Sequence, residues 1–280
     1  MELPKKAKRD PVFAGQFYAP SKASLTKQVE GFLDPGRVKD DAIGVVSPHA
    51  GYIYSGRVAG LVFSSVKPKK TYIILGTYHT GRGSPFGISS AVSWKTPLGE
   101  SPIDRTLADR IIENCPLIKY DELPHEYEHS IEVQLPFLQY QEKDFDFVPI
   151  VIAPASVDNY RQIGAAIARA LKDIKKETSS LIIASSDMTH YESHDSAKEK
   201  DAFVIDAIKA LDEELLVKAI AKHDISMCGY APTAVMICAA KELGADTARL
   251  IEYRTSAEAS GDYSSVVGYA GIVVAKRERN

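Results

Sequence analysis

The chain has only three cysteines, Cys115, Cys228 and Cys238, and they are widely spaced along its 280 residues. An odd, scattered set of cysteines argues against a disulfide framework and indicates a reducing compartment. The charged N-terminus lacks the apolar segment of a secretory signal. No stretch approaches the roughly 20 apolar residues that a membrane-spanning helix needs. We therefore expect a cytoplasmic protein with no membrane association.

The sequence also lacks a strong charge of either sign and the short motifs of several enzyme classes. The formal net charge is −3, and lysine and arginine are scattered among acidic residues, so we expect no nucleic-acid partner. There is no G-x-S-x-G elbow, Walker A loop, H-E-x-x-H helix or closely spaced Cys-x-x-Cys pair. The sequence therefore offers no evident nucleophilic serine for Ser-His-Asp hydrolysis.

Short runs of Val, Ile and Leu alternate with helical patterns almost throughout the chain. Such runs are typical of buried parallel strands, and 280 residues suffice for one large core. We predict a single α/β domain over residues 1–280, with a central mixed, mostly parallel sheet flanked by helices. Residues 1–10 are expected to be a loose N-terminal segment, and the strands at 249–253 and 266–274 to be antiparallel.

Two local predictions concern the middle of the chain. Residues 86–100 are expected to form a hairpin around Trp94. Residues 101–104, Ser-Pro-Ile-Asp, resemble a capping box that starts the next helix.

Three histidines each follow an apolar, β-branched run: His49 after 42–46, His79 after 71–75, and His190 after 181–184. In open α/β sheets, ligands bind at the carboxyl ends of the strands. Three imidazoles at one sheet edge could therefore converge on a metal or a reacting group. Each histidine taken alone could equally be a residue that hydrogen-bonds a turn.

Three further residues lie near these histidines in the predicted topology. Asp187 could fix the tautomer of a histidine or ligate a metal, or it could cap the following helix. Cys228, in a loop between two helices, could ligate a metal as thiolate, although free cysteine is most often a small buried hydrophobe. His129 begins a helix with acidic neighbours and could reach the edge of the site or be a surface or capping histidine, with the site edge favoured, whereas His125 is expected at the surface.

Five segments in this order resemble the MEMO family, whose microbial members are often called AmmeMemoRadiSam system protein B. The resemblance runs from about residue 9 to the last strand. The segments are SPHAGY (47–52), GTYH (76–79), EHSIEVQLP (128–136), SSDMTHY (185–191) and MCG (227–229).

The resemblance implies a fold like that of the class III extradiol ring-cleaving dioxygenases, which use mononuclear Fe(II). By similarity, His49 and His79 would be metal ligands and His190 would act as acid or base, with Asp187 orienting it. Cys228 would stand where those enzymes supply a carboxylate ligand. A thiolate there changes the charge donated to the metal, which puts ordinary catechol cleavage in doubt.

Three hypotheses follow. The first is a mononuclear non-haem metal protein, with Fe(II) favoured and copper next, of redox or oxygen-linked activity on an unknown substrate. The second is a non-catalytic module that binds a peptide or protein in the same pocket, and the third is a zinc-dependent hydrolase. The resemblance also implies radical-SAM and AMMECR1-like proteins as pathway partners. The residues expected to line the pocket are His129, Tyr52, Tyr54, Tyr78 and Tyr191.

Overall fold

The computed structural model of the protein describes residues 8–277. The centre of its main sheet consists of four parallel strands in the order β1-β8-β2-β7. Almost all of their residues are buried because helices cover both faces of the sheet. The strands are β1 (Ala42–Ser47), β2 (Thr71–Thr77), β7 (Asp146–Ile152) and β8 (Ser180–Ser185).

Antiparallel pairs extend this parallel centre on both sides. On one side β11 (Val266–Ala275) pairs with β1, with β10 (Thr247–Thr255) and with the short β9 (His190–Glu192). On the other side β3 (Phe86–Ile88) runs antiparallel to β7 and parallel to β6 (Lys119–Tyr120). The predicted mixed sheet, including its antiparallel last strands, is therefore confirmed.

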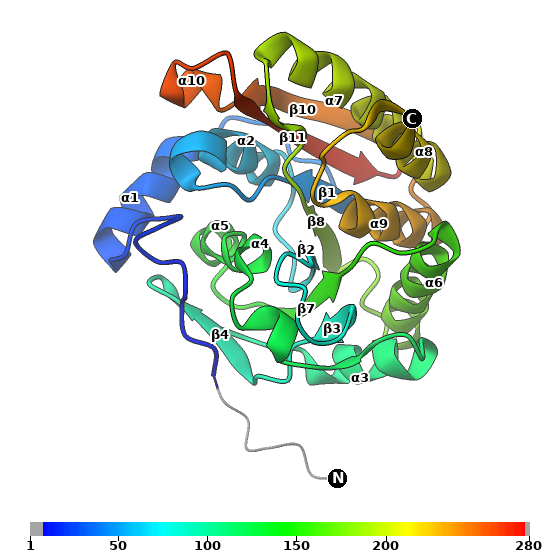
Figure 1. Ribbon diagram of the computed structural model, residues 1–280. Helices are drawn as coiled ribbons and strands as arrows, with labels where there is room; N and C mark the ends of the chain where they lie inside the picture. The colour runs from blue at the N-terminus through cyan, green and yellow to red at the C-terminus, as the bar shows by residue number, and fades with distance from the viewer. Residues whose placement is uncertain (1–7, 278–280) are drawn as a thin grey trace.

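Helices form a layer on each face of the sheet (Figure 1). Alternate strand residues divide the interior between the two faces, so that Ile73 and Leu75 belong to one hydrophobic core and Tyr72 and Ile74 to the other. None of the helices within residues 8–277 has the length and apolar character needed to cross a bilayer. The first layer comprises α3 (Arg105–Asn114), α6 (Val157–Asp173), α7 (His194–Lys209), α8 (Glu213–His223) and α9 (Tyr230–Glu242); the second comprises α1 (Lys22–Phe32), α2 (Tyr52–Ser64), α4 (His129–Glu132) and α5 (Leu135–Gln141); η1 (Leu123–His125) and α10 (Ala257–Ser260) lie in connections.

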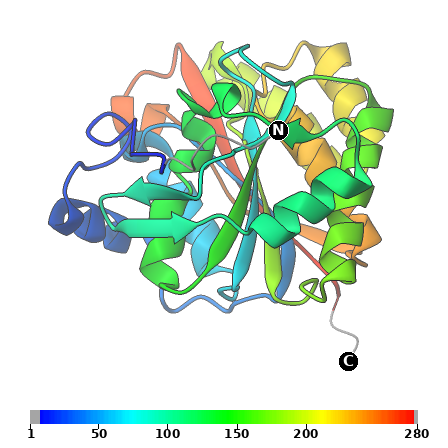
Figure 2. The ribbon, with the colours of Figure 1, turned by 90° about the horizontal axis from the view of Figure 1, so that it is seen from below.

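The hairpin and the capping box differ from the sequence prediction. The hairpin consists of β4 (Ser93–Thr96) and β5 (Gly99–Pro102) and lies beside the main sheet (Figure 2). Residues 86–88 instead join the main sheet as β3. The helix cap is Asp104, whose side chain accepts the Leu107 N–H, because Ser101 is already part of the hairpin.

Residues 1–7 of the predicted loose segment lie outside the described residues, but Arg9 is buried. Its Nη1 lies 2.6 Å from Glu132 Oε2, and its guanidinium stacks 4.1 Å from the centroid of Trp94. Glu132 also accepts the backbone N–H groups of Val12 and Phe13. The chain is thus fixed from Arg9 onward, through a partner 123 residues away that local sequence does not reveal.

Candidate metal centre

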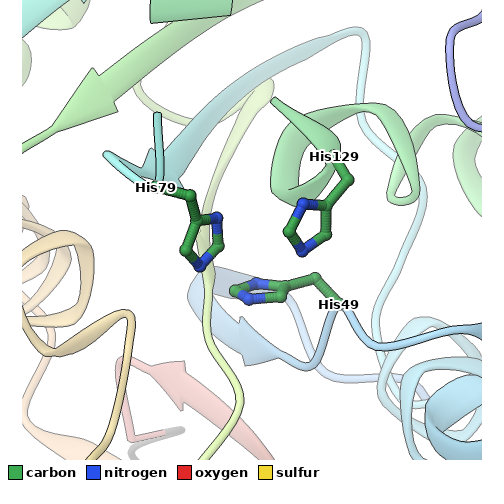
Figure 3. A group of neighbouring side chains, drawn as sticks. All are labelled: His49, His79 and His129. Carbon is green, nitrogen blue, oxygen red and sulfur yellow. The ribbon is translucent and has the colours of Figure 1, made fainter. Parts of the chain in front are cut away.

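Three imidazoles meet at the carboxyl edge of the parallel strands (Figure 3). His49 lies two residues after β1, His79 two residues after β2, and His129 is the first residue of α4. One ring nitrogen from each histidine lies within 4.8 Å of those from the other two. The structure therefore brings together the two predicted histidine ligands, and adds His129 as a third member of the group.

The hydrogen bonds of Ser185 fix the tautomer of His49. The hydroxyl donates its only hydrogen to the carbonyl of Ser130 at 2.7 Å. It must therefore accept from its two other partners, Gln134 Nε2 at 2.8 Å and His49 Nδ1 at 3.0 Å. Because Nδ1 of His49 carries the proton, its Nε2 keeps a free lone pair.

Glu128 acts on His79 in the same way. Its carboxylate accepts from His79 Nδ1 at 3.0 Å and from the His79 backbone N–H at 3.2 Å. Burial alone would raise the pKa of Glu128, but the hydrogen bonds and the neighbouring imidazoles outweigh it and hold that pKa below its ordinary value. An ionised carboxylate can only accept, so Nδ1 of His79 donates and Nε2 is free to bind a ligand.

His129 is held by aromatic neighbours. Its ring stacks on His79 with centroids 4.7 Å apart and contacts Phe17 at 4.6 Å. Burial lowers the pKa of His129 to about 4 and also lowers the pKa of His49. Both rings are therefore neutral near pH 7, the form in which imidazole binds metal ions.

Gly76 allows α4 to approach the end of β2. A Cβ atom at Gly76 would lie 2.4 Å from Ile131 Cγ1 and 2.8 Å from Ser130 Oγ. The Ser130 hydroxyl accepts the Thr77 N–H at 3.0 Å, which joins the helix to the strand. Close contact at this glycine is what places His129 beside His79.

Cys228 lies against His49 in the loop before α9. Its Sγ is 3.2 Å from His49 Nε2 and 3.7 Å from the carbonyl oxygen of Asp187. Burial raises the pKa of the thiol, so without a bound cation it is protonated. Gly229 permits this position, because a Cβ there would lie 2.4 Å from the Ser185 carbonyl oxygen.

Asp187 and His190 do not pair as expected. Asp187 Oδ1 accepts the backbone N–H groups of His49 at 2.8 Å and Ala50 at 3.3 Å, and burial raises the pKa of its carboxyl to about 6. His190 is instead oriented by Ser226, whose carbonyl oxygen lies 3.0 Å from Nδ1. Because a carbonyl only accepts, Nδ1 of His190 donates and its Nε2 is unprotonated when the ring is neutral.

The four predicted pocket tyrosines occupy different environments. Tyr54 and Tyr191 line a hollow of about 450 Å³ that His129, Asp187 and His190 also border. The ring of Tyr52 is 2% exposed in the core, and its hydroxyl donates to the Val133 carbonyl. The hydroxyl of Tyr78 donates to the Gly83 carbonyl, so that tyrosine fastens the loop after β2.

Sequence reasoning missed residues that support the site. Glu128 was noted only as an acidic neighbour of His129 and not as the partner of His79, whereas Ser185 and Gln134 carry no local signal because their partners come from other elements. His125 was expected at the surface but is fully buried, with Nε2 3.0 Å from the Gly87 carbonyl oxygen. Its place is determined by packing against Trp94, which follows from the position of the hairpin.

Comparison with known proteins places these observations in context. The family model for Memo-like proteins matches residues 9–273. A MEMO1 family protein of Methanosarcina acetivorans is 43% identical over 95% of this chain and 98% of its own, and one of Methanopyrus kandleri is 42% identical with the same coverage. An uncharacterised Escherichia coli protein of known structure has the same fold, with a TM-score of 0.55 and 13% identity over 83% of this chain and 99% of its own.

Proposed function

The chain belongs to the Memo-like, or MEMO1, family, and we propose that it is a mononuclear non-haem metal protein whose ion is held by His49, His79 and His129. One observation carries the proposal. Ser185 and Glu128 each accept a hydrogen bond from an Nδ1, which leaves the opposite ring nitrogen with its lone pair at the centre of the group. Such outer hydrogen bonds are typical of metal-binding histidines.

The spacing of the donors supports this assignment with a small adjustment. Two nitrogens that share an ion at about 2.1 Å lie about 3.0–3.4 Å apart. The three nitrogens are separated by up to 4.8 Å, so binding requires the rings to move inward. His49 and His79 are each held at Nδ1 and at the backbone N–H, whereas the partly buried His129 ring is held by ring contacts, so we expect His129 to move most.

Cys228 is proposed as a further ligand. A sulfur at about 2.3 Å and a nitrogen at about 2.1 Å from one ion are about 3.1–3.6 Å apart for angles between 90° and 109°. The separation of 3.2 Å between Cys228 Sγ and His49 Nε2 lies in this interval. Binding would deprotonate the thiol, because a coordinated cation favours the thiolate.

Fe(II) is the proposed metal. Imidazole donors suit iron, copper and zinc, so donor type alone limits the ion to this group. The likeness to the class III extradiol dioxygenases that the MEMO resemblance implies favours iron among them. Bound Fe(II) would supply one-electron and oxygen chemistry on an organic substrate.

The proposed acid–base group is His190. Its Nδ1 is engaged by the Ser226 carbonyl and the residue borders the hollow, so Nε2 can accept a proton from a ligand there. Asp187 has the complementary task of fixing the backbone at His49 and Ala50 through two hydrogen bonds. It thereby keeps the His49 ring in place while protons move at His190.

Metal content tests the proposal. Untagged protein purified without oxygen should contain close to one equivalent of iron, and metal-free protein should take up one Fe(II). The variants His49→Ala, His79→Ala and His129→Ala should each lose most of this metal, and Cys228→Ser should bind it more weakly. Oxygen uptake would then be screened only with iron-loaded protein.

His223→Ala is the matched control, because His223 stacks on Phe203 at 3.9 Å between α7 and α8, outside the site. It should keep the metal content of the parent protein. If the protein contains one equivalent of zinc and does not bind Fe(II), the proposed iron site would be wrong and a zinc-dependent function would take its place. Protein that binds none of iron, copper and zinc would refute the metal site.

A further inference from the structure

The hollow beside the three histidines is the part of the molecule whose composition says most about a ligand. Its volume of about 450 Å³ fits a small organic molecule. It opens between the loop after β1, the start of α4, β9 and the connection between β10 and β11. A molecule bound there would lie next to His129 and His190.

Aromatic rings form much of its wall. Phe17, Tyr54, Tyr191 and Tyr269 all border the hollow. Tyr269 is buried, whereas Tyr54 is 40% and Tyr191 79% exposed, so these two rings stand at the opening. Aromatic side chains therefore border the hollow both inside and at its mouth.

Tyr191 is held at this opening in an unfavourable backbone conformation. Its φ is +61°, in the left-handed region that is unfavourable for a residue with a side chain. The pairing of His190 with Val267 and the hydrogen bond from the His190 N–H to Ser226 Oγ hold the backbone on the N-terminal side of Tyr191. An exposed ring maintained at such a cost is a candidate for ligand contact.

The charged groups of the wall have one sign. Asp187 and Asp262 line the hollow, and none of the described residues that line it is lysine or arginine. Asp262 uses Oδ1 to accept the N–H and the hydroxyl of Ser264. An anionic ligand would therefore meet two carboxylates and neither lysine nor arginine among the described lining residues.

We infer that the hollow binds a small organic cation, an amine with an aromatic or aliphatic body, rather than a phosphate, a carboxylate or another anion. The aromatic rings attract a cation by their negative faces, and the carboxylates add to this attraction. The inference rests on the proposed function only in placing the amine beside a metal. A bound divalent ion would add positive charge beside Asp187 and would weaken this preference, so the metal-free protein carries the test.

Three probes that share one ring and differ in charge test the inference: phenethylamine, 2-phenylethanol and phenylacetate. Binding of each to metal-free and zinc-loaded protein is measured by calorimetry at neutral pH. In the metal-free form phenethylamine should bind about tenfold more tightly than phenylacetate, with 2-phenylethanol between them, and bound zinc should reduce this difference. Asp262→Asn should reduce the ratio of phenethylamine to phenylacetate affinity about threefold. Tyr191→Ala should lower the affinity for phenethylamine about fivefold.

Tyr127→Ala is the matched control, since Tyr127 is 63% exposed and does not border the hollow. It should bind all three probes like the parent protein. In the metal-free protein, tighter binding of phenylacetate, no binding of the amine at millimolar concentration, or an unchanged affinity in Tyr191→Ala would each overturn the inference. Because the metal-free protein is included, a chain that binds no metal but prefers the amine would refute the proposed function and leave this inference standing.

Discussion

Replacement of Ser185 by alanine should weaken metal binding although Ser185 touches no metal. Its hydroxyl accepts from His49 Nδ1 and Gln134 Nε2 and donates to the Ser130 carbonyl. Without it, the proton of His49 is free to move to either ring nitrogen. The form with a free Nε2 is then no longer the only one present.

The size of the effect can be estimated in two parts. If both tautomers became equally populated, apparent affinity would fall only about twofold. Loss of the fixed ring orientation adds to this, and loss of a hydrogen bond to a metal-binding histidine costs about 10–100-fold in metal affinity. Because Gln134 retains the Pro48 carbonyl at 3.0 Å, we expect the lower end, about tenfold, for Ser185→Ala. The protein should also lose about 1–3 kcal/mol of stability, since buried polar groups lose a partner.

Competition for Zn²⁺ with a chromophoric chelator measures the affinity, and circular dichroism establishes that the variant is folded. Ser180→Ala is the control, because Ser180 lies at the other end of β8 and its buried hydroxyl has no hydrogen-bond partner among the described residues. That variant should bind zinc like the parent protein. A folded Ser185→Ala protein with unchanged zinc affinity would refute the tautomer argument.

Three further predictions concern other parts of the molecule. Gly76→Ala should weaken zinc binding and lower the free energy of unfolding by about 1–3 kcal/mol, because the new methyl group would press α4 away from β2. In the same zinc titration and thermal melt, the control Gly31→Ala should lower neither zinc affinity nor stability, because a Cβ there has open space. Arg9→Ala should cost about 3–5 kcal/mol in urea unfolding, because it leaves the carboxylate of Glu132 buried without its cation; a loss below about 1 kcal/mol would mean that the pair is solvated. Burial raises the pKa of Glu213, but its ion pairs with Lys241 and Arg161 outweigh this and lower the pKa below its ordinary value of 4.5. Ionised Glu213 therefore stabilises the fold above pH 4.5, and this contribution is lost as the pH falls through the lowered pKa. Glu213→Gln should lower the free energy of unfolding by about 1–3 kcal/mol near pH 7 and by progressively less in acid. An equal loss at every pH would contradict this.

The fold class was predictable because it depends on patterns that local sequence carries. Runs such as 71–75 and 181–185 are long enough and β-branched enough to be recognised as buried strands. Because predicted helices lie between these runs in the sequence, parallel strands are expected at the centre of the sheet. The hairpin at 93–102 was misplaced because β3 and β4 lie close together in sequence but belong to different sheets. Which sheet a three-residue strand joins depends on its partner, and the partner of β3 is β7, about 60 residues later.

The site was predictable only in part for a related reason. His49 and His79 follow recognisable strands, so the topology alone places them at one edge. The orientation of His190 could not be predicted, because Asp187 is near in sequence but Ser226, 36 residues away, supplies the acceptor. Sequence neighbours favoured a carboxylate–histidine pair that the loop geometry does not form.

The position of His129 in the three-histidine cluster depends on packing between elements. From the sequence it could be a residue of the pocket edge or a surface or capping histidine at the start of a helix. Its position depends on the packing of α4 against Gly76, where any side chain would clash with Ile131. A glycine three residues before His79, inside a strand of otherwise bulky residues, is the one sequence signal of that close approach. The same contact positions Ser130, whose carbonyl accepts a hydrogen bond from the Ser185 hydroxyl. The packing that places His129 in the group therefore also fixes the tautomer of His49.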